Sequence, residues 1–280
     1  MKYGIATPPV DYGMRPDDLA VLVEDMGFES LFFAEHTHIP CGPAALMQTG
    51  SLPPYFSHMY DLFVALGIAA GATRTLLLGS GVNLIPEHDP INAAKALASI
   101  DVLSGGRFLW GIGAGWIHEE LRNMGANPDL RWTMTDEYVQ AIRAIWAHDA
   151  AEFHGRFVDF DAIWSWPKPL RPQGPPLLIG GNGPRVPERV VAYGDEWFPE
   201  DQQTAAELGV RIAAMQAAAG EVGRDPIPVS LFGPKLDLDH LQRLREAGVT
   251  RIVFSAPAGD RDAMLATLDA LVALREAVEA

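Results

Sequence analysis

Short apolar runs alternate along the chain with segments of helical periodicity. Leu31-Phe32-Phe33-Ala34 is continuously apolar, as expected for a parallel strand that is covered on both faces. Arg15–Met26 has a helical pattern, with Pro16 near its start and Gly27 after its end. The predicted strands are Lys2–Ala6, Ser30–Ala34, Thr75–Leu84, Arg107–Gly111, Pro176–Ile179, Glu196–Phe198, Pro228–Phe232 and Arg251–Ser255. The predicted helices are Arg15–Met26, Tyr60–Ala72, Ile91–Leu103, Glu119–Met124, Thr135–Ala147, Pro187–Tyr193, Ala205–Ala219, Leu238–Ala247 and Asp262–Val278.

This alternation predicts an α/β fold, a single (β/α)8 barrel of the TIM type. Eight strand–helix units fit a chain of 280 residues as one domain over 1–280. An open, doubly wound sheet is the alternative architecture. Glu152–Phe160 is typical of a small hairpin that turns at His154-Gly155, and it forms an insertion before the fifth strand. Thr37 to Ser57 is rich in Gly and Pro and predicts a long loop, which in a compact domain often serves binding.

Composition narrows the class of protein. The formal net charge of -15 argues against sequence-independent binding of nucleic acid, which requires a basic face. No apolar run is long enough to span a membrane, and no secretory signal is visible at the N-terminus. Cys41 is the only cysteine, which fits a reducing compartment. We therefore expect a cytoplasmic protein that acts on a small molecule.

The active site of such a barrel lies at the carboxyl ends of its strands. His36 follows the second predicted strand and is the predicted catalytic residue, because a neutral imidazole can take or give a proton near pH 7. The plain structural alternative is a histidine that ends the strand and hydrogen-bonds a neighbouring carboxylate.

Glycines follow the fourth and fifth predicted strands. Gly180-Gly181-Asn182-Gly183 precedes a helix, so its N–H groups could hold a phosphate, although an ordinary turn has the same spacing. Gly111-x-Gly113-x-Gly115 lacks the GxGxxG spacing of a dinucleotide-binding fold. The indole of Trp116, beside these glycines, could form one side of a pocket for a flat ring. We predict no metal site, and we interpret Glu87-His88-Asp89 as a solvated turn.

Several segments together resemble the luciferase-like flavin- and coenzyme F420-dependent oxidoreductases. Leu78–Pro86 resembles the third strand of that family. Lys95–Arg107, which ends in Leu103-Ser104-Gly105-Gly106-Arg107, resembles the segment that runs into the glycines before Trp116. The resemblance continues in the family's order through Arg131–Tyr138, Phe153–Phe157, Pro167–Pro169, Ile179–Asn182 and Tyr193–Pro199.

The resemblance implies a deazaflavin or isoalloxazine ring laid across the strand ends, with coenzyme F420 as the cofactor and FMN as the alternative. It implies a bulge with a non-prolyl cis peptide near Gly81-Val82, which backs the ring. His36 would lie at the redox carbon. The cofactor-binding residues implied in this way are Glu35, Gly81, Val82, Asn83, Gly113, Gly115 and Trp116 near the ring, and Gly180, Gly181 and Asn182 at the phosphate.

The chain departs from this pattern at two places. Some F420-dependent dehydrogenases have a general-acid Glu directly after the fourth-strand glycines, where this chain has Trp116 and its nearest carboxylate is Glu119. Some relatives hold the phosphate with Thr and Lys after the sixth strand, where this chain has Glu200 and Asp201, which would repel it. A sugar-phosphate dehydrogenase is therefore disfavoured, and F420 against FMN stays open.

The sequence thus predicts an F420-dependent oxidoreductase that transfers a hydride between reduced deazaflavin and a small organic substrate. One alternative is an FMN-dependent luciferase-like monooxygenase that uses O2. Another is a flavin-binding barrel without catalysis. A flavin or F420 reductase is the expected partner, and relatives that pair through helices near strands two to four imply a homodimer. Trp164 and Trp166 suggest a hydrophobic or aromatic substrate.

Overall fold

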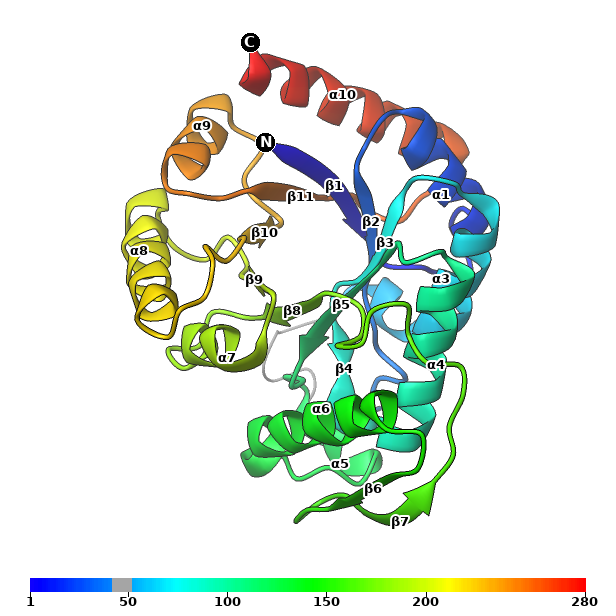
Figure 1. Cartoon of the computed structure of the whole chain (residues 1–280). Helices are drawn as coiled ribbons and strands as arrows, with labels where there is room; N and C mark the ends of the chain where they lie inside the picture. The colour runs from blue at the N-terminus through cyan, green and yellow to red at the C-terminus, as the bar shows by residue number, and fades with distance from the viewer. Residues whose placement is uncertain (42–51) are drawn as a thin grey trace.

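The computed structural model describes residues 1–41 and 52–280. Within these residues, eight parallel strands follow one another in the order β10-β11-β1-β2-β3-β5-β8-β9. Parallel bridges between Trp197 and Val229 and between Glu200 and Phe232 join β9 to β10 and close the ring. Figure 1 shows this ring of strands with the helices on its outside. The predicted (β/α)8 barrel is confirmed.

The elements have the following bounds in the described part of the chain. The strands are β1 (Lys2–Thr7), β2 (Ser30–Phe33), β3 (Leu77–Ser80), β4 (Asn83–Leu84), β5 (Phe108–Gly113), β6 (Ala151–His154), β7 (Asp159–Ile163), β8 (Leu177–Gly180), β9 (Glu196–Phe198), β10 (Ser230–Phe232) and β11 (Arg251–Ser255). The α-helices are α1 (Pro16–Asp25), α3 (Leu62–Ala72), α4 (Pro90–Leu103), α5 (His118–Asn123), α6 (Arg131–Ala147), α7 (Val186–Tyr193), α8 (Ala205–Glu221), α9 (Leu238–Glu246) and α10 (Arg261–Glu279). Three short 3-10 helices complete the set: η1 (Pro54–Ser57), η2 (Ile85–Glu87) and η3 (Pro128–Leu130).

Side chains just before the helices fix where several of them begin. Asp89 accepts a hydrogen bond from the backbone N–H of Asn92, and Pro90 occupies the first turn of α4. Thr204 and Glu207 form a reciprocal capping box at the start of α8. These polar caps lie directly before apolar periodic segments, which is why the sequence located the helices closely.

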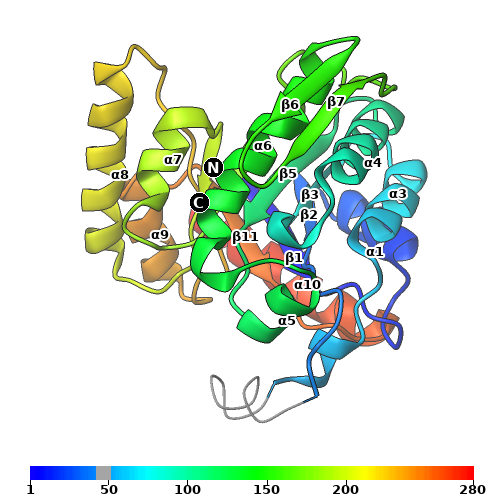
Figure 2. The same ribbon diagram turned by 90° about the horizontal axis from the view of Figure 1, so that it is seen from below.

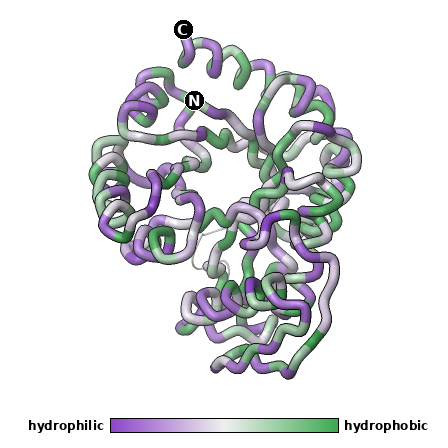
Figure 3. The backbone as a smooth tube through the Cα atoms, in the orientation of Figure 1, coloured by the Kyte–Doolittle hydropathy of each residue, from purple (hydrophilic) through white to green (hydrophobic). Residues whose placement is uncertain are grey.

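Hydrophobic side chains form one cluster inside the barrel and another between barrel and helices. The inner cluster comes from alternate positions of the strands and consists of Ala6, Phe32, Leu109, Leu178, Phe198 and Val253. The larger outer cluster lies between the strands and helices and includes the buried side chains of Trp110 and Trp146. Figure 3 shows hydrophobic residues along the strands, while the helices alternate between hydrophobic and hydrophilic residues. The filled lumen leaves the strand ends as the place for a site.

The amino-terminal end of the barrel is joined by a buried ionic network. Arg251 on β11 donates to Glu196 on β9 at 2.6 Å and to Glu29, just before β2, at 2.7 Å. The hydroxyl of Ser230 on β10 also accepts from Arg251 at 2.7 Å. One guanidinium therefore links strands from opposite parts of the sequence.

Several predicted elements differ in detail from the structure; the helix predicted over Thr135–Ala147, for example, begins at Arg131. The fourth predicted strand continues two residues further, because β5 ends at Gly113. The third is divided into β3 and β4 by Gly81-Val82, whose peptide bond is cis, where the resemblance implied it. The hairpin turn is wider than His154-Gly155, since Gly155 N donates to the Val158 carbonyl.

The β6–β7 hairpin is the insertion predicted before the fifth barrel strand. It lies outside the ring, where β6 packs against α6, as the second view makes clear (Figure 2). The predicted Thr37–Ser57 loop contains η1, and its residues 42–51 lie outside the described part of the chain. No helix among the described residues is both long and apolar enough to cross a membrane.

Candidate active site

A cleft of about 210 Å³ opens at the carboxyl ends of the strands. Strand ends and the loops that follow them contribute its lining. The lining residues are Gly81, Val82, Leu84, Gly113, Ala114, Gly115, Trp116, Arg131, Trp132, Gly180, Gly181, Phe198, Glu200 and Phe232. Seven of the predicted cofactor residues therefore meet in one place: Gly81, Val82, Gly113, Gly115, Trp116, Gly180 and Gly181.

The floor of the cleft depends on glycines that flank Val82. A Cβ added at Gly113 would lie 2.6 Å from Val82 Cγ2, and one at Gly180 would lie 2.9 Å from Val82 Cγ1. Real Cβ atoms do not approach other atoms so closely, so larger residues would displace Val82. Because the aromatic side chains of Trp116, Trp132, Phe198 and Phe232 line the same cleft, it fits a flat, tricyclic ring.

His36 and Glu120 form a buried pair beside this cleft. His36 Nδ1 lies 2.8 Å from Glu120 Oε2, and both side chains are almost completely buried. The imidazole also packs edge-to-face against Trp116, with ring centroids 5.8 Å apart, and Phe56 from η1 packs against both rings. Held through Nδ1, the ring keeps Nε2 for a ligand, and Nε2 has no hydrogen-bond partner among the described residues.

Glu35 supports the bulged strand rather than lining the cleft. Its carboxylate accepts from Asn83 Nδ2 at 2.7 Å and from the Leu84 backbone N–H at 2.5 Å. His88 Nε2 donates to its other oxygen at 2.9 Å. Asn83 is also occupied, since its Oδ1 accepts from the Trp110 indole at 3.2 Å. Glu35 therefore holds both residues of β4, Asn83 and Leu84, and so fixes the strand directly after Val82.

Glu87 is buried, so the prediction of a solvated turn at Glu87-His88-Asp89 is wrong for this residue. Burial, reinforced by the charges of Glu120 and Glu35, raises the pKa of Glu87 to about 8. Burial alone would lower the pKa of His88, but its hydrogen bond to the Glu35 carboxylate raises it overall. Asp89 faces away and caps α4. No group of three or more His, Cys, Asp or Glu in the described ranges is arranged to hold a metal.

The loop after β8 offers backbone groups at the opposite side of the cleft. Gly181 has a φ of 102°, a conformation that favours glycine. The Asn182 side chain is bonded to the backbone of Glu200 in both directions, with Nδ2 donating to the Glu200 carbonyl and Oδ1 accepting from its N–H, each at 3.0 Å. Asn182 therefore joins this loop to the end of β9, while Gly180 and Gly181 face the cleft.

The expected repulsion by Asp201 is not present in the structure. Its carboxylate is nearly fully buried and accepts from the Lys235 backbone N–H at 3.0 Å and from His240 Nε2 at 2.9 Å. Only Glu200 lines the cleft, and its carboxylate accepts from Gln202. Arg131 lines the same cleft and has a buried Nε without a hydrogen-bond partner among the described residues. The cleft therefore has one acidic and one basic side chain.

Comparisons with known proteins agree with this geometry. Residues 13–234 match the family described as luciferase-like monooxygenase. The chain belongs to the luciferase-like monooxygenase family. The uncharacterized protein Rv0953c of Mycobacterium tuberculosis is 36% identical over 279 residues, which make up 98% of each chain.

Solved structures show the same fold over the whole chain. Monooxygenase RslO1 from Streptomyces bottropensis has a TM-score of 0.80 at 19% identity and covers 100% of both chains. An F420-dependent secondary alcohol dehydrogenase has a TM-score of 0.77 at 18% identity and covers 99% of both chains. Relatives by sequence include an F420-dependent hydroxymycolic acid dehydrogenase of Mycobacterium tuberculosis, 29% identical over 60% of this chain and 47% of its own, and an FMNH2-dependent dimethylsulfone monooxygenase of Pseudomonas fluorescens, 28% identical over 75% of this chain and 53% of its own. Membership shows a luciferase-like oxidoreductase or monooxygenase and is compatible with both cofactors.

Sequence reasoning about this luciferase-like enzyme missed Glu120 and named only Glu119 as the carboxylate nearest to Trp116. The signal was present, because Ile117, Glu120 and Leu121 are spaced as neighbours on one face of a helix, and all three are buried. Glu119 lies on the partly exposed side and pairs with Arg122. The cleft residues Arg131, Trp132, Phe198 and Phe232 were also missed, since no local pattern places separate segments around one ring site.

Trp164 and Trp166 do not line the cleft of the luciferase-like barrel. Both side chains are exposed, at 85% and 58%, on the segment after β7. The aromatic surface of the cleft comes from other residues, so the lining does not support a contact of these two tryptophans with the substrate.

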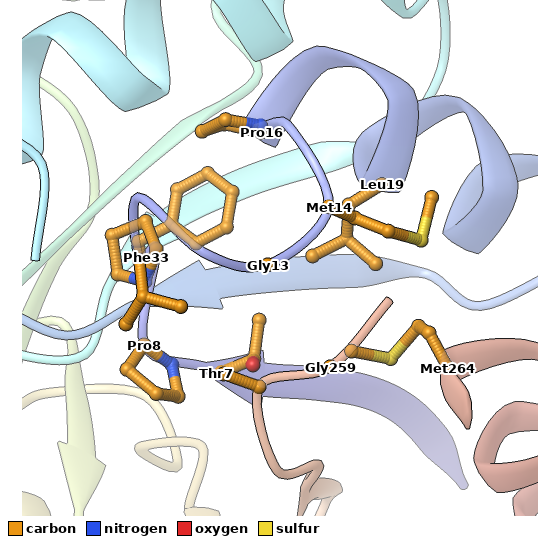
Figure 4. Close-up of a pocket in the computed structure, with 12 residues that line it drawn as sticks. Thr7, Pro8, Gly13, Met14, Pro16, Leu19, Phe33, Gly259 and Met264 are labelled. Carbon is orange, nitrogen blue, oxygen red and sulfur yellow. The ribbon is translucent and has the colours of Figure 1, made fainter. Parts of the chain in front are cut away.

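A second, smaller crevice lies between the loop after β1 and the loop before α10 (Figure 4). Its side chains are apolar, including Met14, Leu19, Phe33 and Met264, apart from the Thr7 hydroxyl. That hydroxyl is buried without a hydrogen-bond partner among the described residues. Among the described residues that line this crevice there is no acid, base or cation.

Proposed function

We propose that the protein is an F420-dependent oxidoreductase that transfers a hydride between the deazaflavin and a small organic substrate. When bound, the cofactor supplies the hydride chemistry, and the protein supplies orientation and a dry pocket. The residues that would hold it are Gly81, Val82 and Gly113 under the ring and Gly180 and Gly181 at the phosphate. The glycine floor that additional Cβ atoms would fill supports this assignment.

The observation that carries the proposal is the His36–Glu120 pair at the edge of the cleft. Oxidation of an alcohol or reduction of a carbonyl moves one proton together with each hydride. His36 Nε2 exchanges that proton with the substrate oxygen, while Glu120 holds Nδ1 and stabilises the imidazolium form. Phe56 and Trp116 cover the imidazole and limit the access of water.

The first test is a titration of the apo-protein with F420 and, separately, with FMN, followed by tryptophan fluorescence. Trp116 and Trp132 line the cleft, so a bound ring is expected to quench them. Micromolar or tighter binding of F420 without binding of FMN supports the proposal. Preference for FMN, together with oxygen uptake by the reduced complex, would replace it with an FMN-dependent monooxygenase. Binding of neither would leave a barrel without this catalysis.

We further propose a homodimer and a reductase partner that supplies reduced cofactor. Every residue of α3 is apolar or glycine, yet Val64 is 62% and Ile68 39% exposed. A helix that is hydrophobic on all sides is normally buried. A second copy of the chain on this helix would cover the exposed apolar positions.

A further inference from the structure

Three buried carboxylates gather beside the proposed catalytic histidine. Glu35 follows β2, Glu87 ends η2 and Glu120 lies in α5, and each is less than a tenth exposed. Each charge in such a cluster raises the cost of ionising the next. The proposed reaction uses His36 and Glu120 but assigns nothing to Glu87.

Hydrogen-bond donors are distributed unequally among the three groups. Glu35 accepts from Asn83, from the Leu84 backbone and from His88, so both of its oxygens are satisfied as an ionised carboxylate. Glu120 accepts only at Oε2, and its buried Oε1 has no partner among the described residues.

Glu87, like Glu120, has one carboxylate oxygen that receives no hydrogen bond from the described residues. Its Oε2 accepts a long hydrogen bond of 3.4 Å from the Thr37 hydroxyl. Its Oε1 is buried and has no partner within the described ranges. Burying two carboxylate oxygens without donors, together with two negative charges, costs free energy. A proton on one of the two carboxyl groups removes one charge and supplies one hydrogen-bond donor.

The charged groups beside Glu87 favour its neutral form, and one neutral donor opposes them. Glu35 approaches from the end of β2 and Glu120 from α5, and both negative charges raise the pKa of Glu87; the long hydrogen bond from Thr37 lowers it. His88, directly after η2, is paired with Glu35. α6 packs on η2 and carries Tyr138, whose phenol has a raised pKa through burial and the charge of Asp89. The raised pKa of Glu87, about 8, follows from burial and from the two neighbouring carboxylates.

We propose that Glu87 stores the proton that reloads His36 after it has protonated the substrate, while Glu120 holds the imidazole in place. This inference rests on the proposed function and assigns the site to substrate reduction, with a carbonyl compound as the substrate class. Glu87 and Glu120 act through His36, so they are relay and positioning residues rather than groups that touch the substrate.

The proton balance of one turnover is complete. When bound, the reduced deazaflavin would supply the hydride for the carbonyl carbon; as the C=O π bond breaks, the oxygen takes the proton from Nε2 of the His36 imidazolium. The neutral imidazole keeps its Nδ1 proton on the Glu120 carboxylate, and the Glu87 O–H proton returns to Nε2 across water. Glu87 is left as a carboxylate and regains a proton from solvent.

The test is a histidine NMR titration of the apo-protein, which needs neither cofactor nor substrate. In the wild type, the ring signals of His36 are expected to report the ionisation of Glu87 as an inflection near pH 8, because that ionisation adds a charge beside Glu120. Glu87→Gln should remove this inflection. Glu119→Gln, the neighbour of Glu120 that pairs with Arg122, should retain it. Identical titrations of His36 in the wild type and Glu87→Gln would overturn the proposal.

Infrared spectroscopy of the wild type provides the second readout and does not depend on the folding of a variant. A carbonyl band of a protonated carboxylic acid is expected at pH 7 and should disappear as the pH rises through about 8. Absence of this band at pH 7 would overturn the proposal that Glu87 stores a proton. If the band and inflection are present but F420 does not bind, the proton store stands and the proposed function fails.

Discussion

His36 Nδ1 and Glu120 Oε2 lie 2.8 Å apart although 84 positions separate the two residues in the chain. β2 delivers the histidine to the end of the barrel, and α5, after β5, delivers the carboxylate. A buried carboxylate at this distance fixes the tautomer and the orientation of an imidazole. The pair therefore gives the cleft a proton-exchanging group whose reactive nitrogen has a defined direction.

Replacing Glu120 by Gln should slow turnover by roughly 100-fold or more, because the amide cannot stabilise the imidazolium form of His36. Cofactor affinity, measured by tryptophan quenching, should change little, since Glu120 does not line the cleft. Glu119→Gln makes the same chemical change one residue away and is the matched control. A Glu120→Gln enzyme with wild-type turnover would contradict the assigned role.

Gly113→Ala should weaken cofactor binding at least about 10-fold. The new methyl group would lie 2.6 Å from Val82 Cγ2 and push the floor into the cleft. Gly67→Ala on α3 is the control, because nothing lies within 4 Å of an added Cβ there. Both variants should be checked for native circular dichroism before titration. Unchanged affinity in Gly113→Ala would show that the ring does not rest on this floor.

Glu87 should make stability fall as pH rises through the neutral range. Its folded pKa of about 8 lies above its ordinary value of 4.5, so the folded protein keeps a proton that the unfolded chain releases. The contribution is complete below about pH 4.5 and is lost as the pH approaches 8. In urea unfolding, the free energy of unfolding of the wild type minus that of Glu87→Gln should therefore decline over this pH window, by on the order of a few kcal/mol. A constant difference from pH 4 to 9 would argue against a protonated Glu87.

Arg251→Gln should destabilise the barrel by about 3–5 kcal/mol, the range for removing one partner of a buried ion pair. Glu196 would be left buried and unpaired, because Arg251 donates to it at 2.6 Å. Arg15→Gln breaks the exposed pair with Asp17 and should leave the free energy of unfolding almost unchanged, because solvent screens this pair. Thermal or urea unfolding of the two variants measures their losses of stability relative to the wild type. Equal losses would refute the prediction.

Ile68→Lys on α3 should convert the proposed dimer to a monomer, because a charge would be placed on its exposed apolar surface. Leu238→Lys introduces the same charge at an exposed position of α9 and should leave the dimer intact. Analytical ultracentrifugation of both variants decides the outcome. A wild-type protein that sediments as a monomer would remove the proposal altogether.

The sequence by itself determined the local elements and the kind of fold. Apolar strands such as Leu31–Phe33, caps such as Asp89 and glycines such as Gly181 act within a few residues, and their preferences are visible in the order of residue types. The alternation of eight such strands with helices then favours a barrel. These local signals placed His36 and the glycines at the strand ends.

Only the tertiary structure decided which side chains meet. The Glu120 carboxylate reaches His36, Glu87 is buried against two other carboxylates, and Asp201 turns away from the cleft toward His240. Each outcome depends on how separate strand–helix units are placed around the ring, and burial and charge interactions arise only after the ring closes. A residue's pKa and its role are properties of that environment, so the order of residues alone does not give them.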